Sequence, residues 1–496
     1  MKRISLLFLA LNLLAVGSGK LRAQSGVAGV EYFQPGYAYR HMLNPAFVPQ
    51  WGYVGFPVLG LLNVDVRSNL GLADFLYPLE NGKLGTFMHP EVSSEEFLSN
   101  IKKRNKIGIG LNTNILSAGW FWGKAFWSFH VGLKSNMQLG IPYEFFDFVK
   151  NEMDANPARY TISDLEASLR AYVEVGIGYS RVLNDEFSVG GKFKFLIGIA
   201  EAELRVNSMD IALSDEAWRI NTNADFRIFG RILDSELPDG SNFPTFDFGA
   251  IAPAGYGAAI DLGGEYRPSF LPGLRFSLAL TDLGFLSYKS QDIARYTAKG
   301  EVLFEGFGNV GPDMDVEQEV DGLVSDLESM ATFEEVPVDE NMSRMINPTL
   351  NIGAEYGFWG NRFSVGILNT TTFYHAYTQS DLSVIANIHP VRWFSVSLAY
   401  SFMGGGNGFG WALNITPSRG LNLFVASNYT PLQVNPQFIP LKRANANIQL
   451  GLTIPLGRNR AYTQDKDPHD VNVFPYSFKD PENHPNKVMM RKMQKK

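Results

Sequence analysis

An alternation of apolar residues with small or polar ones recurs along most of this chain. Between residues 187 and 199, one set of alternate positions is mainly apolar: Phe187, Val189, Phe193, Phe195, Ile197 and Ile199. The intervening positions 188, 190, 192, 194 and 198 carry serine, glycine or lysine. The same alternation returns over residues 127–134, 256–267, 274–281 and 448–456. Because successive side chains of a β-strand point to opposite faces, each segment is predicted to be a strand with one apolar face.

The connections between these strands alternate between short turns and long loops. Turn-like segments lie at residues 119–124, 184–186, 268–273, 359–362 and 417–420, and the longest connection is residues 288–346. Tryptophan or phenylalanine flanks several of the short turns, as in an interfacial aromatic girdle. Outer-membrane barrels have short periplasmic turns and long outer loops. We therefore predict an all-β fold, a transmembrane antiparallel β-barrel of about 14 strands, with 16 as the alternative and short helices in the long outer loops.

Both ends of the chain differ in composition from the strands. Residues 1–23 contain Lys2, Arg3 and a short apolar run, and are predicted to be a signal peptide. Residues 51–457 are assigned to the barrel. Residues 458–496 are polar and proline-rich with a basic end, and are predicted to be a periplasmic tail because the last strand ends on the short-turn side. The predicted location is the outer membrane of a Gram-negative bacterium.

Composition and motifs exclude several kinds of chemistry. The 496 residues include no cysteine, which excludes disulfides, thiolate metal sites and a cysteine nucleophile. A net charge of −7 on an exported chain argues against nucleic-acid binding. Without G-x-S-x-G, H-E-x-x-H or P-loop motifs, we predict no enzymatic activity and no cofactor. The one catalytic alternative is His130 with Ser128 on an inward face, and a histidine hydrogen-bonded to lumen neighbours is the preferred interpretation.

The polar face of the strands supplies the candidate lumen residues. The alternation directs these charged or titratable side chains inward: His130, Glu174, Lys192, Lys194, Asp261, Glu265, Arg267 and Arg275. They fit a salt-bridged interior of either an open or a filled barrel. Residues 201–229 carry too many charges for contact with lipid, and are predicted to form a hairpin that projects beyond the membrane.

The long loop at residues 288–346 is acidic and contains a helical pattern. Between residues 301 and 340 there are thirteen Asp or Glu and no Lys or Arg. The calcium-loop spacing is absent, so no metal site is predicted. An apolar stripe with helical spacing predicts a lid helix over the barrel mouth: Val316, Val320, Leu323 and Leu327.

Three short motifs resemble those of a known superfamily. They are Leu-Asn-Pro-Ala at residues 43–46, Asp-Leu-Gly-Gly-Glu-Tyr-Arg-Pro at residues 261–268 and Leu-Thr-Asp-Leu-Gly at residues 280–284. Together they resemble the long-chain fatty-acid transporter (FadL-like) superfamily, and more closely an uncharacterised family of Bacteroidetes outer-membrane barrels related to it. The resemblance implies a 14-stranded barrel. It also implies a plug-like segment at residues 24–50, with Asn44, Pro45 and Ala46 at its base.

Two functions are carried forward from the resemblance. The first is a transport-type channel for small hydrophobic or amphipathic molecules, which implies a hydrophobic small-molecule ligand. The second is a non-transporting barrel for secretion, surface display or envelope organisation, similar to accessory barrels of type IX secretion, which implies a secretion or surface protein partner. Outer-membrane lipid surrounds the barrel in both cases. A continuous apolar tunnel favours the first function, and a filled lumen with organised outer loops favours the second.

Overall fold

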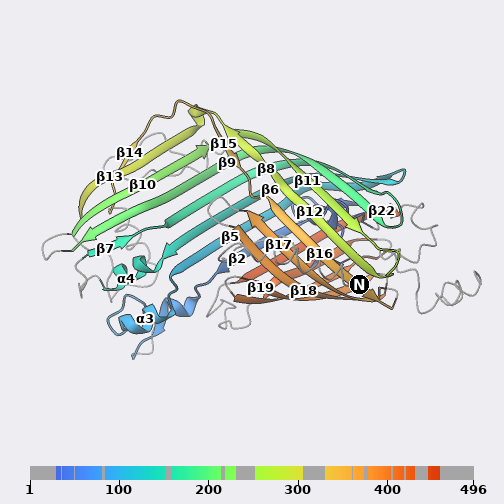
Figure 1. The fold of residues 1–496 in the computed structure, drawn as a ribbon, viewed down its shortest axis with the longest axis horizontal. Helices are drawn as coiled ribbons and strands as arrows, with labels where there is room; N and C mark the ends of the chain where they lie inside the picture. The colour runs from blue at the N-terminus through green and yellow to red at the C-terminus, as the bar shows by residue number, and fades with distance from the viewer. Residues whose placement is uncertain are drawn as a thin grey trace, which may run out of the picture.

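The fold is that of a closed β-barrel with a second body of β-structure beyond one rim (Figure 1). The computed structural model describes residues 29–34, 36–49, 51–80, 84–151, 159–213, 218–230, 252–304, 330–359, 361–373, 378–391, 393–403, 406–417, 420–430 and 445–458. The predicted signal peptide, the lid-helix residues Val316, Val320, Leu323 and Leu327, and nearly all of the predicted tail lie outside these ranges.

The wall is a closed antiparallel barrel of 14 strands, which confirms the predicted fold and strand number. The first wall strand consists of two pieces, β1 (Trp51–Gly55) and β2 (Leu62–Ser68). The other wall strands are β5 (Arg104–Trp122), β6 (Ala125–Pro142), β8 (Leu165–Val182), β9 (Phe187–Ala212), β11 (Gly255–Tyr266), β12 (Leu274–Tyr288), β16 (Thr349–Phe358), β17 (Phe363–Phe373), β18 (Thr378–Val391), β19 (Phe394–Met403), β20 (Gly406–Ile415), β21 (Asn422–Thr430) and β22 (Ala446–Arg458). The barrel closes where β22 pairs with both β1 and β2.

The alternation in the sequence becomes an outside and an inside. Phe193 and Leu278 point outward and are 52% and 54% exposed, whereas Ser188 and Ser277 are buried in the interior. The apolar side chains of the neighbouring strands form the rest of an outward belt, as lipid contact requires. Among the described residues, every helix is too short or too polar to span a lipid bilayer.

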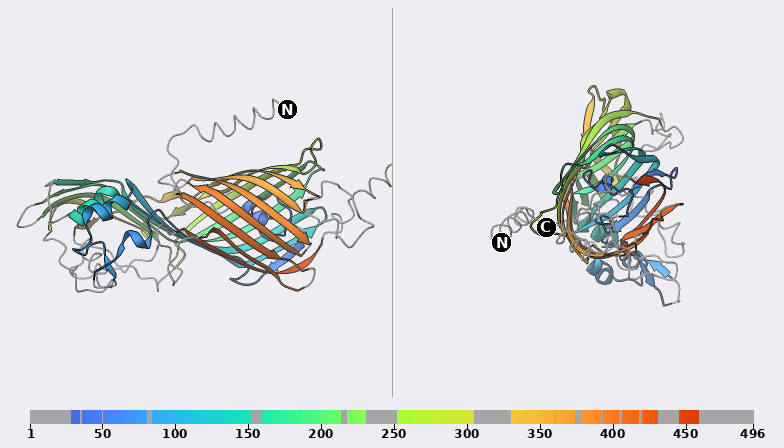
Figure 2. Two further views of the ribbon diagram at one scale, coloured as in Figure 1. Left: turned by 90° about the horizontal axis from the view of Figure 1, so that it is seen from below. Right: turned by 90° about the vertical axis from the view of Figure 1, so that its right-hand side faces the viewer.

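Beyond the long-loop rim, four wall strands continue out of the barrel and gain further strands. We call this body the outer lobe (Figure 2). It contains the upper parts of β5, β6, β8 and β9 together with β3 (Leu76–Pro78), β4 (Leu84–Thr86), β7 (Arg159–Ile162), β10 (Trp218–Gly230), β13 (Ile293–Phe304), β14 (Phe333–Glu335), β15 (Met342–Met345), α3 (Ser94–Asn100) and α4 (Tyr143–Asn151). β10 pairs with β9 and β13. The hairpin predicted at residues 201–229 is therefore the upper part of β9 with β10.

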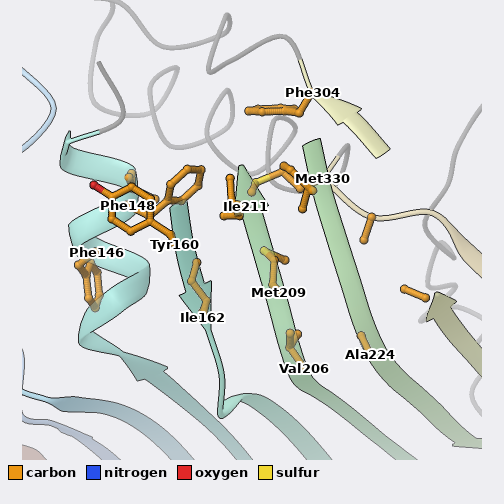
Figure 3. Close-up of a cluster of buried hydrophobic side chains, with 14 of the residues drawn as sticks. Phe146, Phe148, Tyr160, Ile162, Val206, Met209, Ile211, Ala224, Phe304 and Met330 are labelled. Carbon is orange, nitrogen blue, oxygen red and sulfur yellow. The ribbon is translucent and has the colours of Figure 1, made fainter. Parts of the chain in front are cut away.

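The outer lobe has a hydrophobic core of its own (Figure 3). Phe97 of α3 is fully buried and stacks on Phe87 with 4.4 Å between ring centroids. Phe148 of α4 packs edge-on against Tyr160 and Trp218. α3 begins where the Ser93 hydroxyl accepts a hydrogen bond from the Glu96 backbone N–H, the usual role of a serine N-cap. Segments from several long loops thus converge on one core.

The core face of the lobe continues the lipid-facing surface of the barrel. On β8, Ile177 faces outward in the barrel, and Leu165 lies on the same face because their spacing is even. Leu165 pairs with Val206 of β9, and both pack in the core of the lobe. The opposite face of β8 carries Glu174 inside the barrel and Glu166 beyond the rim. The apolar face of this one strand therefore points outward in the barrel wall and packs against the protein core in the lobe.

We expect arginine at an outward belt position to oppose membrane assembly. Phe193→Arg or Leu278→Arg should cost about 2–4 kcal/mol if the site lies near the bilayer midplane, because a charged side chain must leave water. Asn221→Arg, at an exposed position of the outer lobe, is the matched control and should be neutral. Urea unfolding in lipid vesicles, followed by heat-modifiable gel migration, measures the difference. Equal stability of the Phe193 and Asn221 variants would contradict the proposed lipid contact.

Candidate functional site

Residues 29–49 lie inside the barrel, and we call them the lumen segment. Its short helix α2 (Arg40–Leu43) is seen within the wall in Figure 2. Its described side chains are mostly buried. The Val30 backbone N–H donates to the Asn428 side-chain oxygen of β21 at 2.8 Å, and the Asn351 amide of β16 donates to the Leu43 carbonyl at 3.2 Å. The segment is therefore attached to strands that are well separated in the wall.

The motif Asn44, Pro45 and Ala46 sits against glycines of the wall. The Asn44 side-chain oxygen accepts from the Ala46 backbone N–H at 2.9 Å, which fixes the turn. A methyl group built on Gly190 of β9 would lie 1.9 Å from the Pro45 carbonyl oxygen, and one built on Gly263 of β11 would lie 2.1 Å from the Asn44 side chain. Only glycine admits this close approach.

The middle of the lumen segment reaches a break in the first wall strand. The Tyr39 hydroxyl lies 2.9 Å from the Ser117 hydroxyl of β5, and a methyl group on Gly55 or Gly60 would collide with Tyr39. His41 Nε2 lies 2.7 Å from the Tyr53 hydroxyl. The buried side of the wall break is thus filled by the lumen segment.

The lumen candidates from the sequence fall into two charged groups. The first, which we call the lysine cluster, joins β6, β8, β9, β11 and β12. Lys194 contacts Asp261 at 2.8 Å and Asp282 at 2.6 Å, and Lys134 contacts Glu174 and Asp282 at 3.1 Å each. His130 Nε2 lies 2.9 Å from a Glu174 carboxylate oxygen. No hydrogen bond joins His130 to Ser128, both of which are described, so the catalytic pairing does not form.

The second group lies nearer the short turns. Arg275 of β12 contacts Glu355 of β16 at 2.7 Å and Glu265 of β11 at 3.8 Å. Arg267 donates to the Ser188 hydroxyl at 2.6 Å. Each of these side chains is almost fully buried, so their charges are screened little by water. All eight lumen-facing candidates of the sequence are buried in the interior: His130, Glu174, Lys192, Lys194, Asp261, Glu265, Arg267 and Arg275.

A cavity of about 80 Å³ remains between the lumen segment and the wall. We call it the lumen cavity. Its lining includes Lys134, Lys192 and Lys194 from the wall and Glu31 from the lumen segment, with several asparagine and threonine side chains between them. Burial raises the pKa of the Glu31 carboxyl to about 7, and hydrogen bonds from its neighbours oppose that rise. Apolar side chains, among them Met42, Leu43 and Leu61, also line the cavity, so charged and apolar surfaces lie side by side in it.

A second cavity, the mouth groove, opens where the strands enter the outer lobe. Its volume is about 70 Å³, and its lining carries alternating charges. Arg344 contacts Glu201 at 3.0 Å and Glu203 at 2.6 Å, while Arg104 contacts Glu166 at 3.3 Å. None of these residues was among the lumen candidates. Arg344 lies on β15, and the others lie on β5, β8 and β9. Alternation along those three strands could have indicated them, but a β-bulge in β9 beside Ala171 of β8 changes which residues face inward.

Among the described residues, no group of three or more histidine, aspartate or glutamate side chains is arranged to hold a metal ion. The carboxylates of the lysine cluster are instead paired with ammonium groups. These paired side chains offer charge and hydrogen bonds for recognition.

Comparison with known proteins gives a family and several solved barrels. A family model described as "Family of unknown function (DUF5723)" matches residues 45–428. No curated protein matches the sequence. Similar solved structures include the Pseudomonas putida toluene transporter TodX, with 9% identity over 88% of this chain and 98% of that chain and a TM-score of 0.38. The Ralstonia pickettii toluene transporter TbuX has 10% identity over 87% and 99%, with a TM-score of 0.34.

A Pseudomonas aeruginosa FadL homologue has 10% identity over 89% of this chain and 100% of that chain, with a TM-score of 0.39. The sequence motifs resemble the FadL-like superfamily, and a FadL homologue is among the solved structures to which this chain is similar. At such low identity and TM-score, no residue role and no ligand is transferred from them to this chain.

We expect the buried Arg275 to be needed for stability. Arg275→Met should cost about 3–5 kcal/mol, because it leaves the Glu355 carboxylate buried without its partner. The double variant Arg275→Met with Glu355→Gln should recover part of that loss. Arg219→Met, at an exposed position of β10, is the matched control. Urea midpoints of the refolded barrels test this, and a single variant as stable as the control would show that the pair contributes nothing.

Proposed function

Since the chain belongs to DUF5723, a family of unknown function, we propose its function from its own geometry. The protein is an outer-membrane barrel that presents the outer lobe at the cell surface as a contact surface for a protein partner. It serves secretion, surface display or envelope organisation. In this proposal the short turns and the tail after residue 458 face the periplasm, as short turns do in outer-membrane barrels.

The hydrophobic core of the outer lobe is the observation that carries the proposal. A loop that only rims a channel needs no core, whereas this one buries aromatic rings from α3, α4 and four or more strands. Burying such side chains stabilises a fixed arrangement by about 1.5–3 kcal/mol each before the entropy of ordering is subtracted. A structured body on the outside of a membrane protein is suited to binding another macromolecule.

The solvent-facing side of the lobe is polar and mixed in charge. On β10, Arg219, Asn221 and Asn223 alternate with the buried core residues and are exposed. The ion pairs of Arg295 with Asp225 and of Arg344 with Glu203 hold this face in one arrangement. A surface that combines fixed charges of both signs gives specificity and register in protein recognition.

The interior gives less support to transport of a hydrophobic molecule. Such a solute would pass the lumen segment and a cavity whose lining includes three lysines, two glutamates and an aspartate. Removing those charged groups from water without a partner for them is costly. The charged groups buried in the lumen and the organised outer lobe are the combination expected of the non-transporting alternative. We therefore place partner binding ahead of hydrophobic transport.

The orientation can be tested by cysteine labelling, because the chain has no cysteine of its own. In intact cells, Asn221→Cys in the outer lobe should react with a large membrane-impermeant maleimide. Asp185→Cys, in the exposed turn between β8 and β9, should react only after the outer membrane is permeabilised. The two sites are both exposed, so the difference reports the side of the membrane. Labelling of Asp185→Cys alone in intact cells would reverse the proposed orientation.

The role of the lobe is tested by emptying its core. Phe97→Ala should destabilise the lobe by about 3–5 kcal/mol, because it leaves a cavity beside Phe87 and Phe146. The lobe should become sensitive to protease in intact cells while the barrel keeps its heat-modifiable migration. Chemical crosslinking followed by purification should lose the partner captured by the native protein. Phe270→Ala, at an exposed turn position, is the control.

Retention of every crosslinked partner by a protease-sensitive Phe97→Ala lobe would refute the proposal. Loss of uptake of a fluorescent hydrophobic probe in that variant, with partners retained, would favour transport instead.

A further inference from the structure

Lys192 of β9 stands apart from the other buried lysines of the barrel. It is 4% exposed and lines the lumen cavity. Among the described residues, its ammonium has no hydrogen-bond acceptor and no ion-pair partner. Gly178 of β8 makes room for it, since a methyl group there would lie 3.3 Å from the Lys192 side chain. A buried ammonium without a partner is costly, so its position beside a cavity calls for an explanation.

The carboxylates near Lys192 are already engaged by other groups. Asp261 lies directly opposite Lys192 across the β9–β11 ladder. One Asp261 oxygen accepts from the Asp282 backbone N–H at 2.8 Å, and the other contacts Lys194 at 2.8 Å. Glu174 lies between His130 and Lys134. An anion entering the cavity would therefore meet Lys192 as the one lysine of the cluster without a carboxylate within ion-pair distance among the described residues.

Glu31 of the lumen segment places a carboxyl group, whose charge is opposite to that of Lys192, in the same cavity. It is 1% exposed and lines the lumen cavity with Lys192. The Gln449 amide donates to its Oε1 atom at 3.4 Å, while its Oε2 atom has no hydrogen-bond partner among the described residues. A buried carboxyl oxygen of this kind is available to accept from a cation.

The remaining lining combines amide side chains with apolar ones. Asn63, Asn112 and Asn114 can donate and accept hydrogen bonds, and Met42, Leu43 and Leu61 supply apolar contact. Such a lining suits a small solute that carries charges on a short hydrocarbon chain. A cavity of about 80 Å³ has room for a few water molecules or for a small organic solute in their place. The cavity and the mouth groove lie along the same face of β6, because Lys134 lines the cavity while Asn136 and Gln138 line the groove.

We infer that the lumen cavity is a binding site for a small zwitterion. The carboxylate of the solute binds the Lys192 ammonium, and its ammonium group binds the Glu31 carboxylate. Each charge of the solute satisfies a buried group that has no full partner in the empty barrel. This site is independent of the outer lobe and of the partner proposed for it, and it takes a ligand class opposite to a hydrocarbon.

The test uses probes that vary the distance between two charges. The purified full-length barrel in detergent is titrated, by flow dialysis, with radiolabelled acetate, glycine, 4-aminobutanoate and 6-aminohexanoate. One of the amino acids should bind at least about tenfold more tightly than acetate, since a hydrogen bond to a charged group contributes that much or more. The preferred chain length then measures the separation of Lys192 from Glu31.

Two variants test which residue binds each charge of the solute. Lys192→Met should weaken binding of acetate and of the preferred amino acid by at least about tenfold. Glu31→Gln should reduce the preferred amino acid to the affinity of acetate and leave acetate unchanged. Lys299→Met, at an exposed position of β13, is the matched control. Since Lys192→Met removes an unpaired buried charge, its urea midpoint should be equal to that of the native barrel or higher.

Failure of all four probes to bind the native barrel would overturn the inference, as would equal affinity for acetate and every amino acid. Binding unchanged by Lys192→Met would also overturn it. A lower urea midpoint for Lys192→Met with no change in probe affinity would give Lys192 a structural role only. None of these results bears on the outer lobe, so the inference and the proposed function fail separately.

Discussion

Pairing of the last wall strand with the first is the constraint on which the barrel depends, because lipid offers no partner to an unpaired backbone group. The first strand is broken at residues 56–61, where Val58 has a φ of 64°, strained for a β-branched residue. β22 nevertheless stays paired there: the Leu452 backbone N–H donates to the Leu59 and Gly60 carbonyls. The Thr113 hydroxyl donates to the Val58 carbonyl at 2.7 Å. The break is therefore bridged without leaving the wall open.

A closed wall of this size encloses more space than its own side chains fill, and the lumen segment occupies much of it. The wall and the segment are matched residue by residue. Gly190 and Gly263 receive the turn at Asn44, and Gly55 and Gly60 receive Tyr39. Buried charges then tie strands that are not sequence neighbours, as Asp282 does with Lys134 and Lys194. Such pairs add specificity more than net stability, since each charge first loses its hydration.

The sequence predicted the barrel well because its signal is local: the outward positions of Phe193 and Leu278 follow from alternation alone. The same alternation places residue 282 on the outward face, so it did not predict that Asp282 faces inward. A bulge opposite Asp261 and a φ of 59° at Asp282 turn its side chain into the cavity. The charges of residues 201–229 indicated a hairpin beyond the membrane, but its core could not be predicted. Phe97, Phe148 and Phe226 come from different loops, and nothing in their local patterns records that they meet.

The unbroken strands that join the barrel to the outer lobe have a mechanical consequence. β9 runs for 26 residues and β8 for 18, so each has one end in the barrel wall and the other in the lobe. Tension applied to the lobe along these strands acts parallel to them and loads many inter-strand hydrogen bonds at once, in shear. A hinged domain would instead transmit such a force through one linker. The lobe should therefore be rigidly connected to the wall. A force that a bound partner applies to the lobe would then be transmitted directly to the barrel.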